Sequence, residues 1–160
     1  PLLLRLGKLD TAELWKVYLP VIFGSFLFMV PAIFVAEKRR AHRAMLRLSV
    51  AGLVLVCAFL PWASHNFYLL AFGLTGFFVM FNVLEALQPS LVSRVAPPDL
   101  KGLALGLYNT SQAAGLFLGG MLGGTLAVLG GSSAVFWTSC GLSALWLGVT
   151  WGMKPFGLKH

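Results

Sequence analysis

Apolar residues fill five long runs of the chain, and short polar stretches separate the runs. The runs cover residues 17–36, 45–63, 67–87, 102–129 and 134–152, and a polar tail extends the third to residue 93. A helix rises about 1.5 Å per residue, so about 20 apolar residues cross a hydrocarbon core about 30 Å thick. We therefore predict an all-α integral membrane protein, a helix bundle of five transmembrane helices.

The stretches between the runs predict how neighbouring helices are joined. Residues 64–66 and 130–133 are too short for anything but tight helical hairpins. The fourth run is longer than one crossing needs, so we expect it to be tilted or to extend beyond the bilayer. Residues 17–153 are expected to form the membrane bundle and residues 154–160 a cytoplasmic tail. The chain starts at Pro1, so we expect a piece of a longer protein.

Composition and charge favour a lipid partner over nucleic acid. Charged residues make up 11% of the chain, against about 25% in a soluble domain, so a lipid bilayer must cover much of its surface. The net charge is +7, which can attract phosphate. Five of the twelve Lys and Arg residues, however, lie in one run at 38–47, without the interleaved aromatic rings of a base-stacking surface. We predict no nucleic-acid partner.

The distribution of basic residues predicts the orientation. If the five runs cross the membrane in turn, one side holds nine Lys and Arg residues and the other three, Arg5, Lys8 and Lys16. The nine are Lys38, Arg39, Arg40, Arg43, Arg47, Arg94, Lys101, Lys154 and Lys159. Because basic residues accumulate on the cytoplasmic side, the N-terminus of the chain is expected outside and the C-terminus inside.

A polar face follows the third run. Its members are spaced so that they share one side of a helix: Thr75, Phe78, Asn82 and Glu85. Glu85 lies 18 residues beyond Phe67, or about 27 Å by helical rise, near the cytoplasmic boundary. The favoured interpretation is a salt bridge to the basic residues 38–43 or to Arg94, because neighbouring guanidinium groups oppose proton uptake. A proton carrier is the alternative.

Polar residues of the fourth run mark the middle of the membrane. Gln112 lies about 15 Å from Gly102 by helical rise, and Tyr108 shares its face. We predict a substrate cavity lined by Thr75, Phe78, Asn82, Tyr108 and Gln112. Interhelical hydrogen bonds are the alternative. Ser25 and Met29 of the first run are weaker candidates.

Glycines recur on the fourth run at Gly115, Gly119, Gly120, Gly123 and Gly124. Three of them repeat every fourth residue, on one helix face, where a second backbone can approach closely. We predict that this face packs against another helix.

Enzymatic chemistry is not predicted. Cys57 and Cys140 lie inside apolar runs and have no spacing suited to zinc, so we interpret them as packing residues. No Ser/His, His/Glu or paired Asp constellation lies at a common depth. We expect no metal, no cofactor and no catalytic residue.

Two local patterns resemble the major facilitator superfamily. Gly115-Leu-Phe-Leu-Gly119-Gly120-Met-Leu-Gly123-Gly124 is similar to its antiporter motif G-x-x-x-G-P-x-x-G-G, with Gly120 in place of the proline. Residues 36–43, Ala-Glu-Lys-Arg-Arg-Ala-His-Arg, resemble its loop motif G-x-x-x-D-R/K-x-G-R/K-R/K without the glycines. Residues 81–90, Phe-Asn-Val-Leu-Glu-Ala-Leu-Gln-Pro-Ser, look most like the bacterial YajR-type drug-efflux branch.

The resemblance implies the C-terminal half of a transporter in a bacterial inner membrane. The five runs would be helices eight to twelve, and residues 1–16 a remnant of helix seven with its outer loop. Alternating access against an N-terminal half would export small organic compounds in exchange for protons, with the main proton carrier in that other half. A charge network would join Glu37, Lys38, Arg39, Arg43 and Glu85. The competing interpretation is a five-helix membrane subunit that transports nothing.

Overall fold

Helices account for almost all of the chain. A computed structural model describes residues 11–38 and 42–152. In chain order the elements are η1 (Thr11–Glu13), α2 (Trp15–Lys38), α3 (His42–Ala63), α4 (Phe67–Val95), η2 (Pro98–Leu100) and α5 (Lys101–Gly152). The predicted all-α membrane bundle is thus confirmed for the described residues. Residues 1–10 of the remnant predicted at 1–16, and the tail predicted at 154–160, lie outside them.

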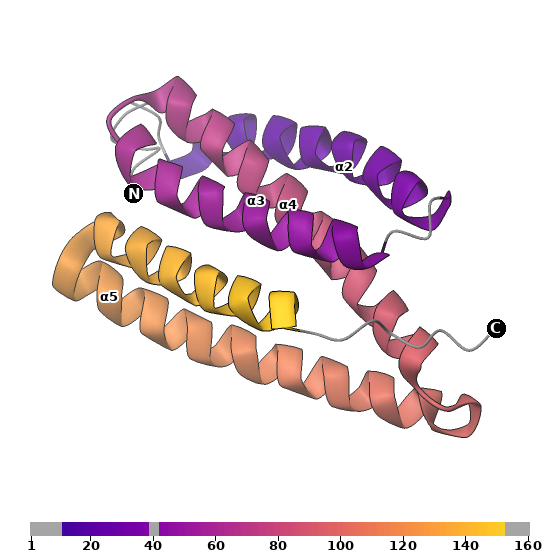
Figure 1. The fold of residues 1–160 in the computed structure, drawn as a ribbon. Helices are drawn as coiled ribbons and strands as arrows, with labels where there is room; N and C mark the ends of the chain where they lie inside the picture. Colours follow the sequence, from indigo (N-terminus) through magenta and orange to yellow (C-terminus); the bar gives the residue numbers. More distant parts are fainter. Residues whose placement is uncertain (1–10, 39–41, 153–160) are drawn as a thin grey trace.

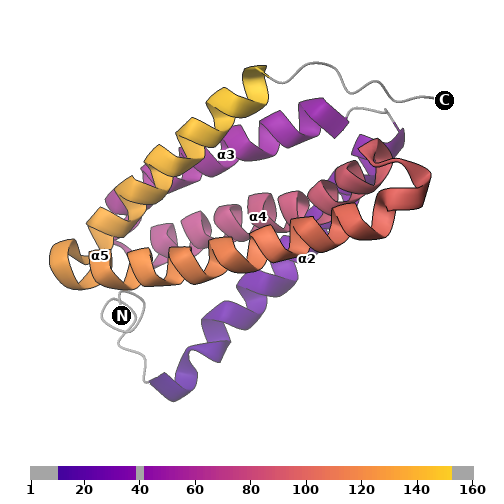
Figure 2. The same cartoon turned by 90° about the horizontal axis from the view of Figure 1, so that it is seen from below.

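Four of these helices are long and apolar enough to cross a membrane. The last of them folds back on itself at Gly131, whose backbone has φ 69° and ψ −171°. Its two arms, residues 101–130 and 132–152, diverge from the turn (Figures 1 and 2). These arms are the fourth and fifth predicted segments. The sequence predicts a turn over residues 130–133. In the structure only Gly131 departs from helical geometry, and the residues on either side of it are helical.

The core of the bundle is built around α3. This helix packs against α4 on one side and against the second arm of α5 on the other. Val50 and Cys57 of α3 have 0% and 1% of their surface exposed, and Cys140 and Trp146 of α5 pack against the same cluster. Both cysteines are free thiols in this packing role, as the sequence predicts.

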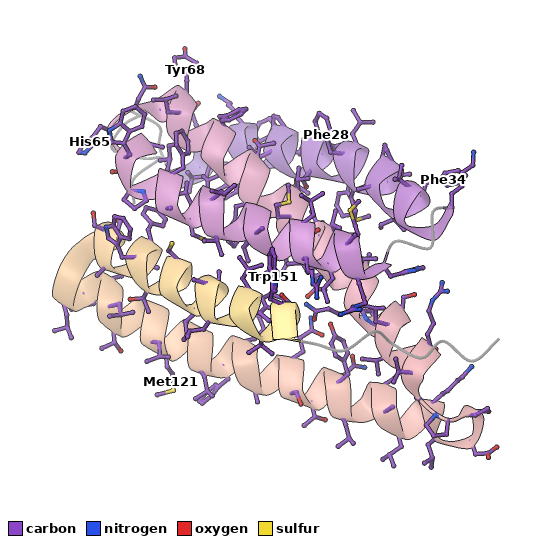
Figure 3. All side chains as sticks on the ribbon, in the orientation of Figure 1. Phe28, Phe34, His65, Tyr68, Met121 and Trp151 are labelled. Carbon is purple, nitrogen blue, oxygen red and sulfur yellow. The ribbon has the colours of Figure 1, made fainter. Side chains whose placement is uncertain are left out.

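Helix α2 is an outlying helix that crosses α4 obliquely (Figure 2). Met29 and Ala32 of α2 pack against Val83 and Leu87 of α4, and this contact is the main one that α2 makes. The remaining sides of α2 expose aromatic residues such as Phe28 and Phe34 (Figure 3), at 62% and 68% exposure. Lipid or further protein must cover these rings.

The predicted turn at residues 64–66 forms a cap for α4. Asn66 is the N-cap residue, and its side-chain Oδ1 accepts hydrogen bonds from the backbone N–H groups of Tyr68 at 2.9 Å and Leu69 at 3.4 Å. These bonds satisfy donors that a helix start leaves without a partner. The cap therefore fixes the residue at which α4 begins.

Arg47 joins the start of α3 to the end of α5. Its Nε donates to the Thr150 carbonyl oxygen at 3.2 Å and its Nη2 to the Trp151 carbonyl oxygen at 3.0 Å. The guanidinium carbon lies 5.5 Å from the centroid of the Trp151 ring, which lies on the side of α5 facing α3 (Figure 3). A cation at a helix C-terminus also complements the helix dipole. Arg47 therefore links α3 to the second arm of α5 at this end of the bundle.

We predict that Arg47→Lys lowers the free energy of unfolding by about 1–2 kcal/mol, because a single ammonium cannot bond both carbonyls and stack on the ring. Thermal unfolding in detergent micelles measures the effect. Lys38→Arg, an exchange between the same two residue types at the exposed end of α2, is the control and should leave the melting temperature unchanged. Equal melting temperatures for Arg47→Lys and the native chain would contradict this role.

Candidate functional site

Two hydrogen bonds join α4 to the first arm of α5, on a face where Glu85 is exposed and its three neighbours are partly buried. The Gln112 Nε2 donates to Glu85 Oε1, and the Tyr108 hydroxyl donates to Gln88 Oε1 at 3.0 Å. Glu85 and Gln88 are three residues apart on α4, and Tyr108 and Gln112 are four apart on α5, so each pair shares a helix face. Because the two helices are antiparallel, the bonds form two successive rungs. We call these four residues the polar ladder.

A third polar contact joins α4 to α2. Asn82 Nδ2 donates to Ser25 Oγ at 2.8 Å, and the Ser25 hydroxyl donates to the Ile22 carbonyl oxygen at 2.7 Å. Ser25 is completely buried. Helix α4 therefore carries polar bonds to two of the three helices packed against it, α2 through Asn82 and α5 through the polar ladder.

The five predicted cavity residues are not brought together in one place. Tyr108 and Gln112 belong to the polar ladder, whereas Asn82 faces α2. The Thr75 hydroxyl donates to the Ala71 carbonyl oxygen at 2.9 Å within its own helix. Phe78 meets the neighbouring Phe77 ring edge to face, with centroids 5.8 Å apart. The alternative interpretation is hydrogen bonding between helices. Three of the five residues form such bonds: Asn82, Tyr108 and Gln112.

Glu85 lies several helical turns from the nearest cation of α4. Its partner Gln112 is ten residues into α5 beyond Gly102, or about 15 Å by helical rise. Arg94, the next cation along α4, is nine residues past Glu85, or about 14 Å. Glu85 is therefore too far along α4 to pair with Arg94, and its position near the cytoplasmic boundary of the membrane stays a prediction.

Among the described residues, Glu85 has another partner than the predicted charge network gives it. Glu85 bonds to a neutral amide and forms no ion pair with Lys38, Arg43 or Arg94 in this part of the chain. Distance is the reason, because those cations lie at the ends of α2 and α4 and the start of α3. Arg39 and the side chain of Glu37 lie outside the described residues, so the network as a whole stays a prediction.

The glycine face of α5 has no packing partner among the described residues. A Cβ atom built on Gly115, Gly119, Gly120, Gly123 or Gly124 would meet no heavy atom within 4 Å. Neighbouring Leu116, Phe117 and Met121 are 67%, 68% and 58% exposed, and Met121 points away from the bundle (Figure 3). The predicted helix contact therefore lies outside these residues or is absent.

Gln88 is the ladder residue that the sequence analysis missed. It follows Glu85 by three residues in a stretch interpreted as a polar tail. Extending the polar face by one further helical step would have found it. No group of three metal-ligating side chains is found among the described residues.

These features define a class of protein. Long apolar helices with exposed aromatic flanks make the chain a multi-pass membrane protein. A carboxylate on a membrane-spanning helix is costly unless protein or water surrounds it. The chain belongs to the Major Facilitator Superfamily, whose family model matches residues 15–157.

Three curated relatives illustrate the similarity. The "Inner membrane transport protein YajR" of Escherichia coli K12 is 41% identical over 144 residues, which are 89% of this chain and 32% of that protein. The "Putative uncharacterized transporter YgaY" of the same organism is 30% identical over 82% of this chain and 32% of its own length. An "Uncharacterized transporter" of Buchnera aphidicola is 30% identical over 69% and 28%.

The chain spans about a third of the length of the curated relatives it matches. No solved structure matches it.

Proposed function

We propose that this chain forms helices eight to twelve of a secondary transporter in a bacterial inner membrane. The whole protein would export small organic compounds in exchange for protons, by alternating access between two halves. Membership of the superfamily and the names of the relatives as transport proteins support this proposal. The observation that supports it is the Glu85–Gln112 hydrogen bond, which holds an exposed carboxylate on the face that α4 and the first arm of α5 share.

The ladder suits Glu85 to carry a proton in this half. An ionised Glu85 accepts a hydrogen bond from the Gln112 NH₂ group, and a protonated Glu85 can donate one to the Gln112 carbonyl oxygen. The amide therefore serves both protonation states without a charged partner. A cation in its place would hold the carboxylate ionised. This reasoning gives Glu85 a coupling role beside any carrier in the N-terminal half.

The open glycine face gives the N-terminal half a place to pack. Without Cβ atoms, a facing helix can approach the first arm of α5 closely, and close packing drives helix association in lipid. The exposed Leu116 and Phe117 beside the glycines would then be covered by protein instead of lipid. The proposed orientation has the N-terminus of the chain outside and its C-terminus inside. It follows from the excess of basic residues on the side of the membrane that holds the C-terminus.

The test uses the full-length protein that contains this chain, reconstituted in liposomes with a pH-sensitive dye inside. A panel of small organic compounds is added under an imposed pH gradient. We expect at least one compound to start a proton flux that empty liposomes lack. The competing interpretation, a membrane subunit that transports nothing, predicts no flux with any compound from correctly folded protein.

A further inference from the structure

The two cysteines of the chain lie opposite each other between α3 and the second arm of α5. These helices lie side by side (Figures 1 and 2) and run antiparallel, since Arg47 near the start of α3 bonds to Thr150 near the end of α5. Cys57 follows Arg47 by ten residues, and Cys140 precedes Thr150 by ten. Equal steps along antiparallel helices lead to the same level, about 15 Å from the Arg47 contact.

Side-chain contacts agree with this register. The Cys140 thiol donates to the Val54 carbonyl oxygen at 3.7 Å. A helical carbonyl points toward the residue four positions later, so this oxygen lies at the level of Cys57. The Cys57 side chain in turn interacts with the side chains of Cys140 and Ser143. Both cysteines therefore belong to one contact between the helices, in the same apolar cluster.

The two thiols differ in accessibility. Cys57 has 1% of its surface exposed, whereas Cys140 is partly exposed. Their neighbours Phe77 and Trp146 are apolar, which suits a reagent that dissolves in lipid. Such a reagent reaches Cys140 first and finds Cys57 behind it. A disulfide joins only residues that face each other, because their Cβ atoms must approach to about 4 Å. It also carries no charge, so it leaves none among apolar side chains.

We propose that Cys57 and Cys140 are a modification site, a thiol pair that a lipid-soluble organic hydroperoxide oxidises to a disulfide. The sulfur of deprotonated Cys140 attacks the hydroperoxide, the O–O bond breaks, an alcohol leaves and Cys140 becomes a sulfenic acid. The Cys57 sulfur then attacks the Cys140 sulfur, and the sulfenic hydroxyl leaves as water with the Cys57 proton. Two thiols lose two electrons, and the hydroperoxide becomes an alcohol and water.

The disulfide gives the second arm of α5 a covalent link to α3. At present Arg47 joins the two helices at one end through hydrogen bonds. A link at Cys57 closes a loop that contains α4 and the first arm of α5, which restricts the unfolded chain. The oxidised protein should therefore melt at a higher temperature than the reduced protein. This proposal does not depend on the transport activity proposed above.

Peptide mapping by mass spectrometry tests the proposal on the full-length protein that contains this chain. The protein is purified under reducing conditions, treated with cumene hydroperoxide, blocked with N-ethylmaleimide and digested without a reductant. We expect a pair of peptides joined through Cys57 and Cys140, and loss of the pair after dithiothreitol. The melting temperature should rise on oxidation and return on reduction.

The matched control moves one cysteine off the contact. Cys140→Ala with Leu142→Cys keeps a cysteine on the same arm, two residues along, at a position whose native side chain is 57% exposed. This variant should give no peptide joined to Cys57. The measurement on the native protein decides the matter if the variant does not fold.

Three results would overturn the proposal. Folded native protein might carry an oxidised Cys140 and an unmodified Cys57 after treatment, which would show that the thiols do not react as a pair. An equal yield of joined peptides in the control variant would show that the arm does not hold this register. Joined peptides found only in disulfide-linked dimers would place the bond between two molecules.

Discussion

Glu85→Gln is expected to weaken proton-coupled transport by the full-length protein and to leave its fold intact. Glutamine has the size of glutamate and can keep a hydrogen bond to Gln112, but it cannot release a proton. Substrate-induced proton flux into liposomes should fall below that of the native protein and stay above that of empty vesicles, because the carrier in the N-terminal half remains. Exchange of substrate across the membrane in the absence of a pH gradient should persist.

The control for this experiment is Glu13→Gln. It neutralises a carboxylate of the same chain that lies in η1, outside the long helices, where it pairs with Lys16. Proton flux should be unaffected. If Glu85→Gln transported protons as fast as the native protein, the coupling site would lie elsewhere, and the ladder would be a structural contact between α4 and α5.

Gly131→Ala is expected to disrupt the hairpin of α5. The backbone at Gly131 has φ 69° and ψ −171°, a region that is essentially restricted to glycine. A residue forced into such a conformation costs about 1–3 kcal/mol, and the free energy of unfolding should fall by that amount. The second arm should also separate from α3. Cys140, which is half-buried against α3, should then react faster with a thiol reagent in a chain carrying Cys57→Ala.

Gly141→Ala makes the same chemical change ten residues further along α5. Gly141 is helical, exposed and has open space around it. Alanine in a helix is favoured over glycine by about 0.5–1 kcal/mol, so this control should unfold no more easily than the native chain. A melting temperature for Gly131→Ala equal to that of Gly141→Ala would show that the turn tolerates a side chain.

The helices of the bundle could be predicted from the sequence because their apolar runs have the length that a bilayer imposes. The third run and α4 begin at the same residue, Phe67, where Asn66 supplies the cap. The residue that turns α5 could not be identified, since Gly130 and Gly131 are the same residue type. The structure places the positive φ at Gly131, and Gly130 is also needed as glycine because a Cβ atom there would lie 2.7 Å from the Cβ of Ala134.

The candidate site could be predicted only in part. Sequence spacing identified Glu85, Tyr108 and Gln112 as polar residues of apolar helices. It did not identify their hydrogen-bond partners. The position of Glu85 is counted from the start of α4 and that of Gln112 from the start of α5. The alignment of these two helices depends on η2 and the turn that joins them, which spacing within either helix does not fix. Arg47 shows the same limit, since its carbonyl partners lie more than a hundred residues away at the end of α5.

The polar bonds on two sides of α4 limit how the sequence of this helix can change during evolution. Asn82 is matched to Ser25, Glu85 to Gln112 and Gln88 to Tyr108. A change in one partner leaves the other polar group unsatisfied among helices, which costs free energy. Drift at these positions should therefore proceed by compensated double replacements. Related chains should keep or exchange each pair together, while exposed residues of α4 such as Phe72 vary independently.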